Sequence, residues 1–154
     1  SMHNIFNRKI FDITFNKDFY QVITTCKNIY RRDQQGTWIS DEIVEAYTKL
    51  HEMGLARSVE VWQNKKLVGG LYGVDIGNGI FCGESMFSKV SNASKVAFYT
   101  LLQDLKEKDY LLLDCQVYNE HLESLGAYEI LRSEYMKYLL EGNIRLRIKK
   151  MKAS

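Results

Sequence analysis

Apolar and polar residues follow two periods along this chain, and the helical period of three to four residues is the clearer one. Ser40 stands where an N-cap is expected for the second helical segment, and Gly54 follows its last turn. We expect Asn16 to cap the first segment and Asn92 or Ser91 to cap the third. The predicted helices span residues 16–30, 40–54, 92–109, 118–126 and 133–142.

Shorter segments alternate with a period of two or are continuously apolar, which is typical of strands. The predicted strands span residues 11–15, 57–63, 67–76, 80–85, 110–117 and 127–131. The turns "NKK" and "GNG" separate the second, third and fourth of these, so they predict an antiparallel meander. Helices and strands then alternate, which predicts an α/β sandwich with a mixed sheet.

Composition narrows the function classes. A chain of 154 residues suits one domain, and a net charge of +2 is too weak to indicate nucleic-acid binding by itself. Cys26, Cys82 and Cys115 are far apart, without a CxxC pair or a His cluster, so we expect neither a metal site nor a disulfide framework. Free thiols fit a cytoplasmic protein. No run of about 18 apolar residues predicts a membrane span.

Polar residues at two strand ends are the best candidates for chemistry. Glu84 and Ser85 end one predicted strand, and the apolar run over residues 110–113 is followed by Asp114, Cys115 and Gln116. Ligands of α/β sheets bind at the carboxyl ends of strands, so these positions favour a cleft. The alternatives are that Asp114 caps a helix or pairs with a lysine, and that Glu84 favours a helix dipole.

The third helix presents an apolar face beside these strands. Phe98, Leu101 and Leu105 share that face, which is normally part of a core. A glycine-rich strand around Leu71 and next to Phe81 would leave space beside it, enough for a medium apolar side chain. At the C-terminus, five cations in residues 145–152 form either a solvated end or a phosphate contact.

Several longer segments together carry a resemblance to a known family. The chain resembles the leucyl/phenylalanyl-tRNA–protein transferases over roughly residues 12–140, in the order and spacing of its segments. The matching segments are "GTWI", "AYTKLHEMGLARSVEVW", "LVGGLYGV", "FCGESMFS", "ASKVA", "LLDCQVYNEHLESLGAYEI" and "RSEY". Family members usually carry a further N-terminal domain ahead of this region, and residues after 140 do not match clearly.

The resemblance implies a domain organisation, an activity and roles for individual residues. It implies an N-terminal extension (1–11), a GNAT-like aminoacyltransferase domain (12–140) and a basic tail (141–154). The family moves Leu or Phe, and by extension Met, from aminoacyl-tRNA to proteins that begin with Arg or Lys, which marks them for degradation. No cofactor or metal is implied. The implied sites are catalytic Asp114 and Gln116; donor-positioning Trp38 and Glu84; a side-chain pocket of Leu71, Phe81, Phe98, Leu101, Leu105 and Leu113; and tRNA contacts at Arg145, Arg147, Lys149 and Lys150.

Two other functions remain open from the residues. The same fold supports acetyl-CoA-dependent N-acetyltransferases, but those use a glycine-rich turn for the pyrophosphate, and the corresponding "SKVSNAS" contains no glycine. The other alternative is a tRNA-binding module without activity, against which the intact "DCQ" argues. The sequence does not predict the oligomeric state.

Overall fold

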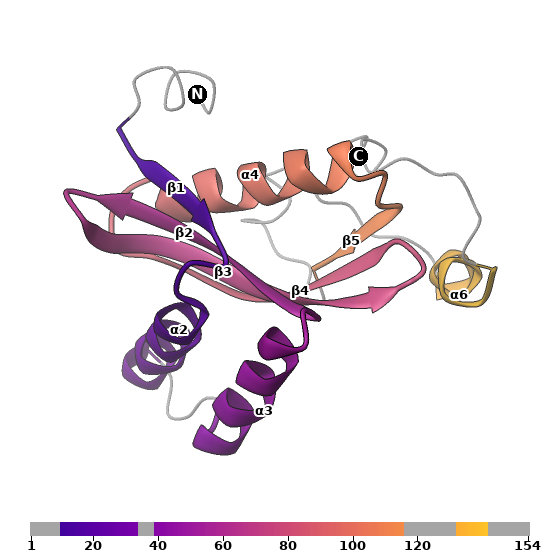
Figure 1. The fold of residues 1–154 in the computed structure, drawn as a ribbon, viewed down its shortest axis with the longest axis horizontal. Coiled ribbons are helices and arrows are strands. Elements are labelled where there is room, and N and C mark those ends of the chain that lie inside the picture. The colour runs from indigo at the N-terminus through magenta and orange to yellow at the C-terminus, as the bar shows by residue number, and fades with distance from the viewer. Residues whose placement is uncertain (1–9, 34–38, 116–131, 142–154) are drawn as a thin grey trace.

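A five-stranded sheet forms the centre of the computed structural model, which describes residues 10–33, 39–115 and 132–141 (Figure 1). The strands follow the order β1-β2-β3-β4-β5, with antiparallel pairing up to β4 and a parallel β4–β5 pair. The mixed sheet with flanking helices confirms the predicted fold class. The strands are β1 (Asp12–Phe15), β2 (Ala56–Gln63), β3 (Lys66–Gly77), β4 (Ile80–Ser88) and β5 (Leu112–Asp114).

Helices cover both faces of the sheet (Figure 1). Helix α4 lies on one face, and α2 and α3 lie together on the other, while α6 lies beside the β4–β5 end of the sheet. The order of helices and strands along the described chain agrees with the predicted one. The helices are α2 (Phe19–Asp33), α3 (Asp41–Glu52), α4 (Ala93–Glu107) and α6 (Arg132–Glu141).

Each face of the sheet has its own apolar core. Val59, Leu71 and Phe81 belong to the core beneath α4. Phe19 and Tyr72 belong to the core between the opposite face and the α2–α3 pair, where their rings meet edge to face. Because successive residues of a strand point to opposite faces, side chains two apart on a strand usually share one of these cores.

The capping predictions were right for one helix only. Ser40 accepts a hydrogen bond from the Ile43 amide and caps α3 as expected. Asn16 does not cap α2: its side chain accepts from the Ser58 amide on β2. Asp18 supplies that cap instead, through the Gln21 amide. All of these bonds satisfy backbone donors that would otherwise be orphaned.

Helix α4 begins without a side-chain cap from the predicted residues. Asn92 occupies the N-cap position at φ 72°, in the left-handed region, and its side chain makes no capping bond. Ser88 instead accepts a hydrogen bond from the Ser94 amide through its Oγ. The start of α4 is therefore fixed by the end of β4. The predicted helix 118–126 and strand 127–131 lie outside the described residues.

Candidate active site at the β4–β5 edge

A β-bulge places Glu84 out of register with its neighbouring strand. Tyr72 pairs with Ser85 and Gly73 pairs with Gly83, so Glu84 has no partner on β3. An extra residue of this kind bends the strand and re-aims its side chain. The bulge explains how Glu84, on a strand that begins as regular core structure, reaches a polar cluster.

The parallel partner strand ends beside the bulge. β5 pairs with β4 through Cys82 and Asp114, and β5 stops at Asp114 while β4 continues to Ser88. The edge of β4 beyond Cys82 therefore has no β5 partner within the described residues. Of the predicted strand over residues 110–117, only Leu112–Asp114 pair with β4 among the described residues 110–115, so the strand begins later than expected; residues 116 and 117 lie outside the described residues.

Five side chains from four elements meet at this edge. Tyr135 on α6 donates a hydrogen bond to Asp114 Oδ2 over 2.7 Å, and the Cys82 thiol lies 3.8 Å from the same oxygen. Tyr47 on α3 is hydrogen-bonded to Glu84. The site residues are thus Tyr47, Cys82, Glu84, Asp114 and Tyr135, drawn from α3, β4, β5 and α6.

Burial and mutual charge set the protonation of this cluster. Burial, followed by the charge of Asp114, raises the pKa of Glu84 from its ordinary 4.5, and the hydrogen bond from Tyr47 opposes that rise. Burial and the nearby carboxylates raise the pKa of Cys82 to about 11. Burial and Asp114 raise the pKa of Tyr135 well above its usual range. The thiol and the phenol are therefore hydrogen-bond donors at neutral pH.

The predicted apolar residues are brought together, on the α4 side of the sheet. All six are buried and belong to a single cluster with β2 and α4. The space expected beside the glycines is filled: a Cβ on Gly73 would lie 2.5 Å from the Phe81 ring, and one on Gly69 would lie 2.6 Å from Ala93 Cβ. The cluster comprises Leu71, Phe81, Phe98, Leu101, Leu105 and Leu113 among others, and its role as a pocket stays a prediction.

Several predicted site residues lie outside the described residues. These are Trp38, Gln116, Arg145, Arg147, Lys149 and Lys150. Within the described residues, sequence reasoning missed Tyr47, Cys82 and Tyr135 as parts of the cluster. Tyr47 follows the spacing of the apolar stripe of its helix and therefore resembles an ordinary core residue. The signal for Tyr135 was its place at the end of the matching segment "RSEY".

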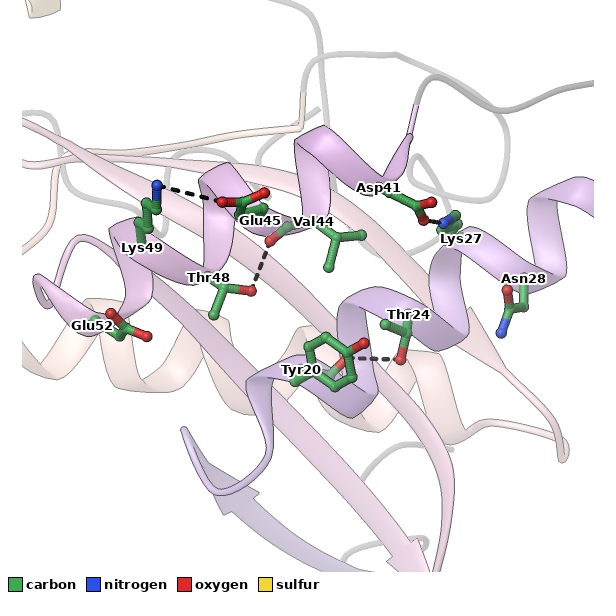
Figure 2. A pocket seen from close by; sticks show the side chains of 10 residues that line it. All are labelled: Tyr20, Thr24, Lys27, Asn28, Asp41, Val44, Glu45, Thr48, Lys49 and Glu52. Atoms are coloured by element: carbon green, nitrogen blue, oxygen red, sulfur yellow. Dashed lines mark hydrogen bonds and ion pairs between the residues drawn. The ribbon is translucent and has the colours of Figure 1, made fainter.

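A pocket of the structure lies elsewhere, between α2 and α3 (Figure 2). It has a volume of about 690 Å³ and is open and mixed in charge. The Lys27–Asp41 and Lys49–Glu45 ion pairs cross or border it, and Tyr20 lines it from α2. None of the five site residues lines this pocket.

Two other kinds of site are absent from the part of the chain that the structure describes. No group of three or more His, Cys, Asp or Glu side chains is placed to hold a metal ion. None of the described helices combines the length and hydropathy needed to cross a bilayer.

Comparison with known proteins decides the family. Residues 1–140 match the family described as leucyl/phenylalanyl-tRNA protein transferase. The chain belongs to this family. Proteins named leucyl/phenylalanyl-tRNA–protein transferase from Flavobacterium johnsoniae and Thermodesulfovibrio yellowstonii are 62% and 48% identical to it, over 90% and 92% of the chain. The chain spans 65% and 58% of the length of these transferases, respectively.

Solved structures place this transferase-family chain in the GNAT-like fold. An aminoglycoside acetyltransferase from an uncultured soil metagenomic sample superimposes with a TM-score of 0.62 at 16% identity, covering 82% of this chain and 94% of its own. A ribosomal-protein-alanine N-acetyltransferase from Brucella melitensis gives a TM-score of 0.56 at 13% identity, covering 79% and 94%. At this identity the likeness concerns the fold alone.

Proposed function

We propose that this chain transfers Leu or Phe, and to a lesser degree Met, from aminoacyl-tRNA to the N-terminal α-amine of proteins that begin with Arg or Lys. The transfer marks these proteins for degradation in the cytoplasm. The observation that carries the proposal is the family match together with the position of Asp114, at the end of β5 and beside Glu84.

The chemistry needs little beyond positioning. The amine nitrogen attacks the ester carbonyl carbon, the new C–N bond forms, and the bond to the ribose oxygen breaks. The ester is already activated, so the reaction requires no ATP, metal or cofactor. An α-amine has a pKa of about 8, so a useful fraction is neutral near pH 7. Holding the two reactants in attack geometry contributes on the order of 7 to 11 kcal/mol in ideal cases.

One proton must leave the attacking nitrogen. Asp114 either accepts that proton or orients the amine while the departing ribose oxygen takes it. Gln116 then holds the amine through hydrogen bonds, and Glu84 and Trp38 hold the aminoacyl-adenosine end of the tRNA. Two carboxylates also favour an acceptor whose first residue carries a positive charge.

The donor side chain would occupy the α4 side of the sheet. Phe81 and Leu113 point to that side, while Asp114 and Glu84 join the polar cluster with α3 and α6. The edge of β4 beyond Cys82, which has no β5 partner among the described residues, lies between the two. A donor placed across this edge would have its carbonyl beside the carboxylates and its side chain among Phe98, Leu101 and Leu105. Because these residues are buried and the space beside the glycines is filled, the donor side chain would enter by displacing them.

Acetyl-CoA-dependent transfer is the second candidate, because the similar folds belong to acetyltransferases. Such enzymes bind pyrophosphate with free amides at a helix start. At the start of α4, the Ala93 amide already bonds to Val90 O and the Ser94 amide to Ser88 Oγ. Because these two amides are already hydrogen-bonded within the chain, they are not available to a pyrophosphate. The start of α4 therefore favours the aminoacyl-tRNA donor over CoA.

A transfer assay tests the proposal. The chain is incubated with Phe-charged tRNA and a peptide that begins with Arg, with and without acetyl-CoA; the same peptide with a blocked α-amine is the control. We expect phenylalanyl-peptide without acetyl-CoA and no product from the blocked peptide. Acetyl-peptide formed only with acetyl-CoA would replace the proposal with the second candidate. tRNA binding without any product would indicate a module without activity.

The role of Asp114 is tested in the same assay. Asp114→Asn is nearly isosteric and should reduce turnover by about 10² to 10⁴. Asp75→Asn is the matched control, because Asp75 also accepts a hydrogen bond from a tyrosine, Tyr110, away from the cluster. Near-normal turnover of Asp114→Asn with unchanged aminoacyl-tRNA affinity would remove Asp114 from the mechanism.

A further inference from the structure

Helix α6 delivers a tyrosine hydroxyl to the carboxylate at the end of β5. Tyr135 Oη lies 2.7 Å from Asp114 Oδ2, which is the geometry of a strong hydrogen bond to a carboxylate. The two residues are 21 positions apart in sequence, so the contact depends on how α6 docks. Tyr135 is only partly exposed, packed against the apolar cluster at the start of β4 and β5.

The docking of α6 is fixed by an anchor one turn beyond Tyr135. Tyr138, three residues further along the helix, is only 5% exposed and packs with Ile80, Leu111 and Leu112. Residues three apart share a helix face, so the anchor and the hydroxyl-bearing ring point the same way. The helix is thereby held on the two strands whose parallel pairing ends at Asp114.

Two donors converge on one oxygen of Asp114. The Tyr135 hydroxyl and the Cys82 thiol both reach Oδ2. A thiol is a weak donor, so of these two donors the phenol orients the carboxylate more strongly. Burial and the adjacent carboxylate raise the pKa of Tyr135 above its usual range, so the phenol keeps its proton throughout the neutral and mildly alkaline range.

We propose that Tyr135 is a positioning residue for the transfer reaction, which holds the Asp114 carboxylate toward the incoming amine by donating a hydrogen bond to Oδ2. The inference rests on the proposed function, in which Asp114 acts on that amine. A carboxylate that must meet a nitrogen in attack geometry gains from a fixed rotamer, because small misplacements of a reacting group cost rate.

A second tyrosine–carboxylate hydrogen bond in the chain serves as the control for the Tyr135–Asp114 bond. Tyr110 donates a hydrogen bond to Asp75, and both lie outside the five-residue cluster. Tyr135→Phe and Tyr110→Phe each remove one phenol–carboxylate bond without changing the ring. A bond that only stabilises the fold would make the two variants alike in kinetics.

The experiment compares Tyr135→Phe, Asp114→Asn, their double variant and Tyr110→Phe in the transfer assay, with melting temperatures measured alongside. We expect Tyr135→Phe to lower kcat about 10- to 100-fold, the size of a lost hydrogen bond to a charged group, with KM for both substrates unchanged. The double variant should be no slower than Asp114→Asn, because Tyr135 acts through Asp114. Tyr110→Phe should keep wild-type kcat.

A second readout does not depend on the stability of the Phe variant. A fluorinated tyrosine at position 135 keeps the shape of the ring but ionises at a lower pH, and the ionised phenol cannot donate. The alkaline limb of the kcat profile should therefore move to lower pH, while the same replacement at Tyr110 should leave the profile in place.

The outcomes separate this inference from the proposed function. Loss of activity in Asp114→Asn with full kcat in Tyr135→Phe would overturn the inference alone. A double variant slowed by the product of the two single effects, or an unmoved pH profile with fluorinated tyrosine, would also overturn it. Full activity in both single variants, or no transfer by the wild-type chain, would overturn the catalytic assignment and the inference together.

Discussion

The carboxyl groups of Glu84 and Asp114 lie close enough for the charge of Asp114 to raise the pKa of Glu84. They lie on β4 and β5, two neighbouring strands whose pairing ends at Cys82 and Asp114. Like charges held together in this way resist ionisation and are a common feature of sites that bind cations or move protons. The arrangement has a measurable consequence for stability.

Glu84→Gln should stabilise the fold at neutral pH and not in acid. A carboxyl whose pKa is raised by folding binds more protons in the folded state, so stability falls as pH rises from the ordinary pKa of 4.5 toward the raised folded pKa. Glutamine removes that loss and can still accept the Tyr47 hydrogen bond. The free energy of unfolding of both proteins is measured in urea at pH 4 and pH 7. We expect Glu84→Gln to be more stable than the wild-type chain by less than about 1 kcal/mol at pH 7, and equally stable at pH 4.

An exposed carboxylate provides the comparison for this effect. Glu107→Gln changes the net charge of the chain equally but lies exposed near the end of α4. An equal gain from both variants would show that overall charge, rather than the proximity of Asp114, controls stability in this range.

Glu60 is fully buried, and its replacement should be among the most damaging changes on β2. Its carboxylate accepts hydrogen bonds from Thr14 Oγ1 at 2.7 Å, from the Lys17 amide at 3.0 Å and from the Ser58 hydroxyl. Glu60→Ala leaves the buried Ser58 hydroxyl and the half-buried Thr14 hydroxyl without this acceptor, at a cost of about 1 to 3 kcal/mol for each group. Glu60→Gln should cost less. A loss below about 1 kcal/mol for alanine in urea unfolding would contradict this role.

Local signals explain which parts of the fold were predictable. Ser40 and the Ile43 amide are three residues apart, so their bond follows from the sequence pattern itself. Asn16 offers an equally good local signal, but its side chain is taken by Ser58, 42 residues away. The competing bond exists only once β1 and β2 pair, and no local pattern contains it.

In the candidate site, too, the predictable features are those with a local sequence signal, and the missed ones depend on contacts between distant segments. Asp114 and Glu84 were predicted as candidates because polar residues at strand ends stand out against apolar runs. The bulge that re-aims Glu84 is a difference in register between two strands and leaves no mark in the spacing of residues. Tyr135 meets Asp114 only through the docking of α6, so a sequence pattern could not assign it to the site.

Gly73 and Gly83 face each other across β3 and β4. Substitution by alanine should destabilise the fold much more at Gly73 than at Gly83. A Cβ on Gly73 would lie 2.3 Å from Cys82 O and 2.5 Å from the Phe81 ring, whereas one on Gly83 meets its nearest atom at 3.7 Å. Gly73→Ala should therefore cost about 1 to 3 kcal/mol through overpacking, and Gly83→Ala much less. Equal melting temperatures for the two variants would show that β3 adjusts without strain.

The six apolar residues of the predicted pocket, three on α4 and three on the sheet beneath it, make the most specific prediction about the donor. If they accept the transferred side chain, the chain should use Phe-, Leu- and Met-charged tRNA and disfavour Ile and Val, whose second β substituent crowds the attack site. A hydrophobic pocket discriminates by only about 1 to 3 kcal/mol per methylene, so Met should still be transferred. The measurement is kcat/KM for the five donors with a single Arg-peptide.

Leu101 and Leu102 on α4 provide a matched pair to locate that pocket. Both are buried in the cluster, but only Leu101 belongs to the predicted pocket. Added bulk at either position overpacks the core, at about 1 to 3 kcal/mol, so Leu101→Phe and Leu102→Phe should lose similar stability. Only Leu101→Phe adds bulk where the donor side chain would enter, so it alone should reduce kcat/KM for Phe more than for Leu. Ile or Val transferred as well as Leu by the wild-type chain, or the same Phe-to-Leu ratio in both variants, would place the donor side chain elsewhere.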